Sequence, residues 1–139
     1  MFADLNWWAV LLSAVASAVL GTLWYSDILF GKKWRDLMGW SGENLSALKE
    51  TSSMSKVYAL NFIFDLLTAF ALWNIGTPLC LSWTCLNIFA IIAWLGFMLP
   101  ILAGSVLWER KSWTLLAINA GYRLVAMLVM AGIIAQFAF

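Results

Sequence analysis

Four long apolar runs separated by polar segments dominate the hydropathy pattern of the chain. They cover residues 5–25, 57–75, 78–107 and 113–135, and about 20 apolar residues are enough for a helix to cross a bilayer. The pattern predicts an all-α, polytopic membrane protein with four transmembrane helices in a single domain over residues 1–139. The first run follows the acidic Asp4 and is longer than the apolar core of a signal peptide, so we expect a retained helix.

The third run carries two helix breakers and both cysteines. Gly76, Thr77 and Pro78 predict a tight turn in which Thr77 caps the third helix and Pro78 takes its first position. Pro100 predicts a kink over residues 97–103. Cys80 and Cys85 would lie on one continuous helix with diverging side chains, so we expect no disulfide between them.

Residues 26–56 form the main polar segment, and its first part has the period of a short amphipathic helix. One face would carry Phe30, Trp34, Leu37 and Met38, and the opposite face Lys32, Lys33, Arg35 and Asp36. Asp27 is a candidate N-cap and Gly39 a candidate stop. We expect this helix to lie at the cytoplasmic interface, with Lys32, Lys33, Trp34 and Arg35 at the lipid headgroups. A second short turn is expected over residues 41–49, and an ordinary solvated connector is the alternative.

The distribution of Lys and Arg predicts the orientation. The first and third loops hold seven of the eight basic residues, whereas the N-terminus, the second loop and the C-terminus hold none. By the positive-inside rule, both basic loops face the cytoplasm and both termini lie outside. We therefore expect a multi-pass protein of the cytoplasmic (inner) membrane.

Two ionisable residues interrupt the apolar runs. Asp65 lies in the second run and Arg123 in the fourth, each four residues after an asparagine, Asn61 or Asn119. Since both helices leave the same side of the membrane, the two ions should reach a similar depth. An isolated ion at that depth costs at least about 2.5 kcal/mol, so we expect Asp65 and Arg123 to pair, with the two amides satisfying the remaining polar atoms.

Two interpretations of this polar cluster remain open. It is either a structural clasp that fixes the register of two helices, or a coupling site along a hydrated path. A one-to-one pair favours the clasp because neutralised ions are poor ligands. The corresponding functions are a structural or accessory membrane protein, and a small-solute or ion transporter or channel subunit.

Composition excludes several other classes. Apolar residues make up 64% and charged residues 11%, whereas a soluble domain has about 25% charged residues. The net charge of +1 indicates no nucleic-acid partner. Histidine is absent, and only Glu109, Arg110 and Lys111 form a polar cluster, so we expect no catalytic residues, metal site or cofactor.

Small residues indicate close packing of helices. Ala9, Ser13, Ser17 and Gly21 recur every four residues in the first run, and the fourth run has Ala117, Gly121, Ala131 and Gly132. Such stripes let helix backbones approach in lipid. They are more numerous than four helices need, so we expect a homo-oligomer or a subunit of a membrane complex.

The two halves of the chain also show a weak similarity. Gly21 to Trp24 resembles Gly104 to Trp108, and Asn61-x-x-x-Asp65 resembles Asn119-x-x-x-Arg123. Two hairpins repeated about an axis along the membrane normal would produce it, and chance likeness between apolar segments is the alternative.

Several motifs together resemble a known family. They are Gly21-x-x-Trp24-Tyr25-Ser26-x-x-x-Phe30-Gly31-Lys32-x-Trp34, Trp94-Leu95-Gly96-Phe97 with Pro100, Gly104 and Glu109, and Trp113 with Asn119-Ala120-Gly121-Tyr122. This set is similar to a domain-of-unknown-function family of small, mainly bacterial, four-helix membrane proteins. The chain differs in Asp27, where proline is expected, and in Arg123, where a neutral residue or histidine is common. The resemblance implies the fold and membrane residence, and no activity.

Overall fold

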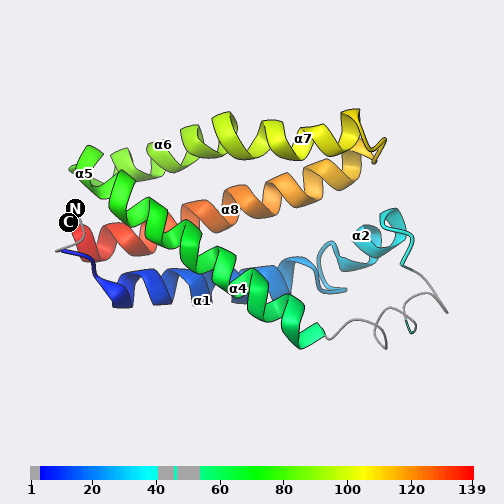
Figure 1. Cartoon of the computed structure of the whole chain (residues 1–139), viewed down its shortest axis with the longest axis horizontal. Coiled ribbons are helices and arrows are strands. Elements are labelled where there is room, and N and C mark those ends of the chain that lie inside the picture. The colour runs from blue at the N-terminus through cyan, green and yellow to red at the C-terminus, as the bar shows by residue number, and fades with distance from the viewer. Residues whose placement is uncertain (1–3, 41–45, 47–53) are drawn as a thin grey trace.

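The computed structural model describes residues 4–40, 46 and 54–139, and its regular elements there are all helical (Figure 1). They are α1 (Trp7–Trp24), α2 (Gly31–Leu37), α4 (Met54–Ala71), η1 (Leu72–Gly76), α5 (Thr77–Leu79), α6 (Trp83–Ala93), η2 (Trp94–Met98), α7 (Leu99–Leu107) and α8 (Trp113–Ala138), where η marks a π-helical turn. Four helical stretches are long and apolar enough to cross a membrane: Trp7–Trp24, Ser55–Leu79, Trp83–Leu107 and Trp113–Ala138. The predicted all-α protein with four membrane helices is confirmed.

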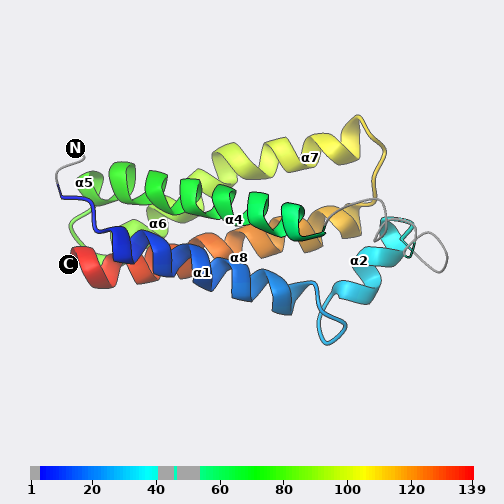
Figure 2. The same cartoon turned by 60° about the horizontal axis from the view of Figure 1, so that its bottom comes forward.

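Helices α1 and α8 form the centre of the bundle. They pack against each other along much of their length, α4 covers α1, and α6 to α7 cover α8. Helix α4 meets α8 over only a short stretch. Figures 1 and 2 show both termini and the α5–α6 turn at one end of the bundle, with α2 and the α7–α8 turn at the other. The described basic residues of α2 and of the α7–α8 turn therefore lie at the same end.

Helix α2 lies within the predicted amphipathic segment. Lys32, Lys33 and Asp36 are exposed, whereas Trp34 and Leu37 are half-buried. Gly39 ends the helix as predicted, at φ 71°, which glycine adopts at little cost. Asp27 is not the N-cap, because the helix starts four residues later and its carboxylate pairs with Arg35 instead. The turn predicted over residues 41–49 lies outside the described residues, apart from Ser46.

The prediction of a tight turn at Gly76 to Pro78 is wrong. The helix continues there through η1 and α5, and the Thr77 hydroxyl donates to the Trp73 carbonyl at 2.6 Å instead of capping a new helix. The π-helical turn just before Pro78 is a local adjustment that accommodates the missing backbone N–H. The chain turns at Cys80, which is extended at φ −121° and ψ 136°, and Ser82 caps α6 by accepting from the Cys85 N–H at 3.3 Å.

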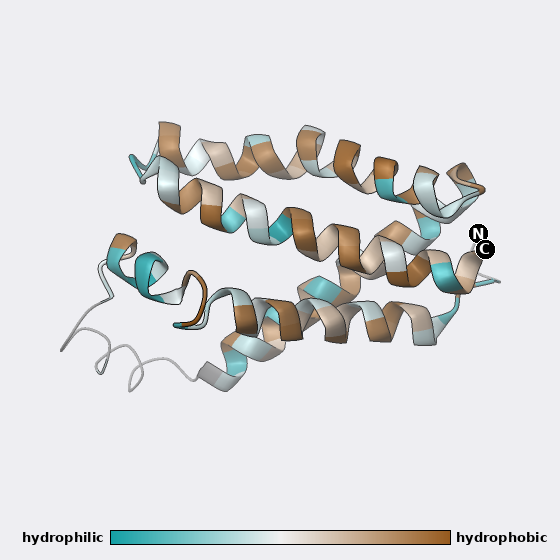
Figure 3. Ribbon diagram, turned by 180° about the vertical axis from the view of Figure 1, so that it is seen from behind, coloured by the Kyte–Doolittle hydropathy of each residue, from teal (hydrophilic) through white to brown (hydrophobic). Residues whose placement is uncertain are grey.

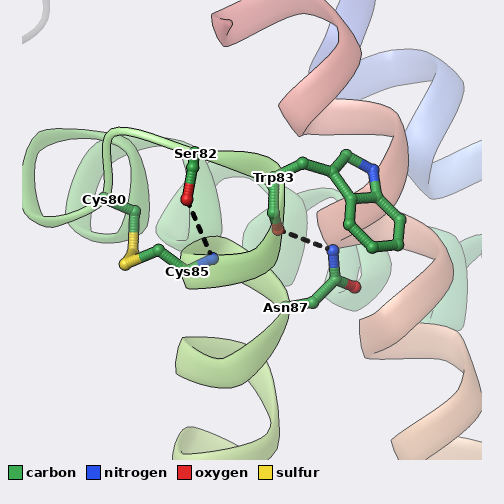
Figure 4. Close-up of a disulfide and its surroundings, with 5 residues drawn as sticks. All are labelled: Cys80, Ser82, Trp83, Cys85 and Asn87. Atoms are coloured by element: carbon green, nitrogen blue, oxygen red, sulfur yellow. Dashed lines mark hydrogen bonds between the residues drawn. A yellow bond between two sulfur atoms is a disulfide. The ribbon is translucent and has the colours of Figure 1, made fainter.

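This shifted turn also overturns the expectation of two free thiols. Cys80 and Cys85 are joined by a disulfide, with their Cα atoms 5.4 Å apart (Figure 4). The expectation placed both residues on one continuous helix. Because Cys80 lies before the break and Cys85 in the first turn of α6, their side chains can meet.

The kink expected near Pro100 takes the form of a π-helical turn. Trp94–Met98 widens just before Pro100, and the α-helix resumes at Leu99. The α6 to α7 stretch is the least buried of the four, and α8 is the most buried. Apolar residues cover the helices along most of their length in Figure 3, as expected of a surface in contact with lipid chains.

Candidate functional site

The two intramembrane ions are in contact. Arg123 Nη1 lies 3.3 Å from Asp65 Oδ1, and Asn61 Nδ2 donates to Asp65 Oδ2 at 3.1 Å. The Asp65 side chain is fully buried, whereas 32% of the Arg123 side chain is exposed. The contact joins α4 to α8 at their short crossing, so each oxygen of the carboxylate has a donor and the charges offset each other.

Helix α1 closes the third side of this cluster with small residues. Ser13 and Ser17 are fully buried, and the Ser17 hydroxyl interacts with the Asp65 carboxylate. Ser17 also lies 3.4 Å from the Tyr122 hydroxyl, which donates to the Ser17 carbonyl at 3.3 Å. A Cβ on Gly21 would lie 2.8 Å from the same hydroxyl. The small-residue stripe of α1 therefore packs inside the protein, where it lets α8 approach.

Asn119 has a different partner from the one expected. Its Oδ1 accepts a hydrogen bond from the Tyr25 hydroxyl at 2.9 Å, whereas the expectation placed it beside the ion pair. Asn61 reaches Asp65 along its own helix, but Asn119 faces the end of α1, so the two amides do not form one group. Burial raises the pKa of Tyr25 to about 12, since the ionised phenol is poorly solvated there.

Aromatic residues surround the ion pair on the side of the basic loops. The Arg123 guanidinium lies 5.2 Å from the Tyr122 ring centroid, and the rings of Tyr25 and Tyr122 meet edge-on at 5.3 Å. Two indoles donate to carbonyl groups of α8, Trp24 to Ile118 at 3.1 Å and Trp94 to Ala120 at 3.0 Å. Hydrogen bonds from two neighbouring helices thus fix this part of α8.

Sequence reasoning missed these aromatic contacts as part of the site. Trp24, Tyr25, Trp94 and Tyr122 lie in the motifs of the family resemblance, but they were not predicted to contact the polar cluster. The structure shows that the first motif packs directly against the Asn119 to Tyr122 motif, although Tyr122 lies 97 positions after Tyr25 along the chain. The signal that could have identified them was the polar atom that each apolar ring carries into a membrane helix.

A tight turn after α1 places Tyr25. The N–H of Phe30 donates to the Trp24 carbonyl at 3.0 Å, and that of Gly31 donates to the Ser26 carbonyl at 2.8 Å. A Cβ on Gly31 would lie 2.2 Å from the Tyr25 carbonyl oxygen. Only glycine fits at this position, which explains the Phe30-Gly31 step of the motif.

The four residues expected at the headgroups have two kinds of surroundings. Lys32 and Lys33 are exposed. Trp34 instead packs within an aromatic cluster, with its ring 5.3 Å from Tyr25 and 5.0 Å from Trp40. Arg35 binds Asp27 and lowers the pKa of that carboxyl group. Of these four residues, only the two lysines therefore present cations without an ion-pair partner in the described part of the chain.

The polar cluster in the α7–α8 turn is internally paired. Lys111 Nζ lies 2.8 Å from Glu109 Oε2. Arg110, between them, has a positive φ of 55°, which is uncommon outside glycine. Among the described residues, no three His, Cys, Asp or Glu side chains are grouped as a metal site would require.

The packing does not reproduce the suggested repeat. Trp24 is hydrogen-bonded against α8, whereas Trp108, its counterpart, is 87% exposed. Two repeated hairpins would also pair α4 with α6 as closely as α1 pairs with α8, and no comparable contact joins the described parts of α4 and α6. The similarity between the two halves therefore has no counterpart in the arrangement of the helices.

Comparison with known proteins identifies a family and no relative of known activity. The family model described as "Protein of unknown function (DUF1761)" matches residues 8–135, which confirms the resemblance to a domain-of-unknown-function family. No curated protein and no solved structure shows significant similarity to the chain.

Proposed function

The chain belongs to DUF1761, a family of proteins of unknown function, and on that premise we propose that it is a non-enzymatic structural or accessory subunit of the cytoplasmic membrane that associates with copies of itself. The observation that carries the proposal is the direct Asp65–Arg123 contact. A carboxylate whose two oxygens are both occupied by protein donors has little capacity left for a solute. Its main effect is to hold α4 and α8 in register across the bundle.

The proposed topology has both termini outside the cytoplasm. The positive-inside rule supports it, because α2 and the α7–α8 turn carry the basic residues at one end. The disulfide between Cys80 and Cys85 lies at the opposite end, together with the termini. Disulfides persist in oxidising compartments, which is a second, independent argument for the same orientation.

The association surface that we propose is the outer face of α6 to α7. The stripe on α1 is already occupied by α8. In contrast, a Cβ built on Gly96 or Gly104 would meet no atom within 4 Å, so packing within one chain does not account for these glycines. Small residues on an exposed membrane helix allow the backbone of a second copy to approach.

Native mass measurement in lipid nanodiscs or mild detergent tests the association. We expect particles of more than one chain, and we expect Gly104→Leu to shift them toward the 15.6 kDa monomer. Gly132→Leu is the matched control on α8, where a Cβ would have room 3.9 Å from Trp83, and it should leave the mass unchanged. A wild-type particle that is monomeric at every protein and lipid concentration would contradict the proposal.

The second candidate function, a small-solute or ion transporter or channel subunit, is supported by the exposure of Arg123. A guanidinium has five N–H donors, and within the described part of the chain it donates one hydrogen bond to a side chain. The exposed third of this side chain could face a hydrated path formed between copies. Solute or ion flux into proteoliposomes that is abolished by Arg123→Gln, in protein shown to be folded, would favour transport over the structural role.

A further inference from the structure

An open groove lies where the end of α1, the start of α2 and the first turns of α8 meet. Its volume is about 380 Å³, and it is lined by Trp24, Phe30, Lys33, Thr114, Ala117 and Ile118. Lys33 and Thr114 supply its polar groups, and Thr114 lies one helical turn closer to the basic-loop end than Ala117 and Ile118. The groove is therefore mainly apolar, and its two polar residues belong to α2 and to the first turn of α8.

The apolar walls of the groove are fixed by contacts inside the protein. The Trp24 indole is held by its hydrogen bond to the Ile118 carbonyl, and its ring lies 4.9 Å from that of Phe30. Small residues on α8 make room for it, since a Cβ on Gly121 would lie 3.3 Å from the indole. A ligand would meet a preformed wall, which lowers the entropic cost of binding.

Lys33 is the charged residue among those that line the groove. Unlike Arg35 and Lys111, which are paired with Asp27 and Glu109, Lys33 has no ion-pair partner in the described part of the chain. Its ammonium group is therefore free to bind an anion, and Thr114, which is also exposed and lines the groove, has a hydroxyl that can donate a hydrogen bond.

We propose that this groove binds one anionic glycerophospholipid. Its phosphate would lie on Lys33 and Thr114, and one acyl chain would follow Trp24, Ala117 and Ile118 into the membrane. Charge complementarity at Lys33 and the apolar walls match both parts of such a lipid, whereas free phosphate would use only the first part. The proposal depends on membrane residence and does not depend on self-association or on the role of the Asp65–Arg123 pair.

Native mass spectrometry of the detergent-purified full chain, titrated with phosphatidylglycerol or phosphatidylcholine, tests the site. We expect one tightly retained phosphatidylglycerol. Because a basic residue at a membrane surface contributes about 1 kcal/mol toward anionic lipid, Lys33→Gln should weaken this retention about fivefold. Lys32→Gln is the matched control, because Lys32 is exposed on the same helix but does not line the groove, and it should leave retention unchanged. Ala117→Phe, which fills the groove, should weaken retention of the lipid without changing any charge.

Several results would overturn the proposal. Equal losses for Lys33→Gln and Lys32→Gln would indicate unspecific attraction to the basic helix. Equal retention of phosphatidylcholine and phosphatidylglycerol would exclude selection for an anionic headgroup. Displacement of phosphatidylglycerol by millimolar inorganic phosphate would indicate a site for the free anion.

Discussion

Breaking the Asp65–Arg123 contact should destabilise the protein unequally, depending on which partner is removed. Arg123→Gln leaves a carboxylate that is fully buried, with Asn61 and Ser17 as its remaining donors. Asp65→Asn leaves a guanidinium that is already 32% exposed and can extend its long side chain toward water. We therefore expect Arg123→Gln to be the more damaging of the two single changes.

The magnitudes follow from the geometry. Opposite charges 3.3 Å apart attract by about 5 kcal/mol at an effective dielectric constant of about 20, and desolvation offsets much of this attraction. Removing one partner of a buried pair costs about 3–5 kcal/mol, which we assign to Arg123→Gln. For Asp65→Asn we expect the free energy of unfolding to fall by about 1–2 kcal/mol, because the remaining Arg123 charge can be solvated. The double variant should recover about 1–3 kcal/mol relative to the sum of the two single losses.

Unfolding of the four proteins in mixed lipid–detergent micelles measures this cycle. The ten tryptophans of the chain provide an intrinsic fluorescence signal. If the unfolding free energy lost by the double variant equals the sum of the two single losses within about 0.5 kcal/mol, the two residues do not interact. A larger loss for Asp65→Asn than for Arg123→Gln would refute the argument from burial, even if the cycle showed coupling.

Three further predictions concern the turns and the aromatic cluster. Gly31→Ala places a Cβ 2.2 Å from the Tyr25 carbonyl oxygen and should lower the free energy of unfolding by about 3 kcal/mol or more. Gly132→Ala, at a helical position where a Cβ has room 3.9 Å from Trp83, should raise the free energy of unfolding by up to about 1 kcal/mol. Equal effects of the two changes would contradict the packing described. Cys85→Ser opens the six-residue loop closed by Cys80 and Cys85 and should lower the free energy of unfolding by about 2 kcal/mol. Reduced wild type should be as stable as the variant. A variant as stable as the oxidised wild type would show that the disulfide does not stabilise the fold. The pKa of Tyr25 is about 12 in the fold and about 10 when unfolded, so the stabilisation from its neutral phenol is complete below pH 10 and is lost as the pH rises to 12. Between pH 9 and pH 11.5 the free energy of unfolding should fall more for wild type than for Tyr25→Phe. Equal decreases for the two proteins would exclude this contribution of Tyr25.

Hydropathy was enough to predict the architecture because a bilayer restricts what can cross it. Every backbone polar group in the membrane must be satisfied internally, so a long apolar run is a helix. The partnership of Asp65 and Arg123 could also be predicted, since depth follows from the number of residues counted from the basic loops and a lone ion is costly there.

The boundary between the second and third spans could not be predicted in the same way. Glycine and proline suggested a turn at residues 76–78, but a π-helical turn carried the helix past them to Leu79. Breaks in a membrane helix depend on which carbonyl groups find donors, and hydropathy does not record this. The disulfide between Cys80 and Cys85 was missed for the same reason.

The contacts between neighbouring helices at the site also could not be predicted from the sequence. Which face of α8 meets α1 depends on the rotation of both helices, and both are apolar on nearly every side. Asn119 was therefore assigned to the ion pair, whereas α8 turns it toward Tyr25. A contact such as Tyr25 to Asn119 is determined by the tight turn at Gly31 together with the small residues of α1.

The central claim is that the carboxylate of Asp65 and the guanidinium of Arg123 touch inside the membrane. Solid-state NMR on the protein in lipid bilayers, with ¹⁵N-labelled arginine and ¹³C-labelled aspartate, measures it most directly. The structure predicts a measurable dipolar coupling between Arg123 Nη1 and the Asp65 carboxyl carbon, consistent with the 3.3 Å contact to Oδ1, and no water cross-peak at Asp65. Because Arg35 and Asp27 also pair, the signal is assigned by its loss in the Arg123→Gln protein. Absent coupling, with both groups in contact with water, would contradict the clasp and favour the transport alternative.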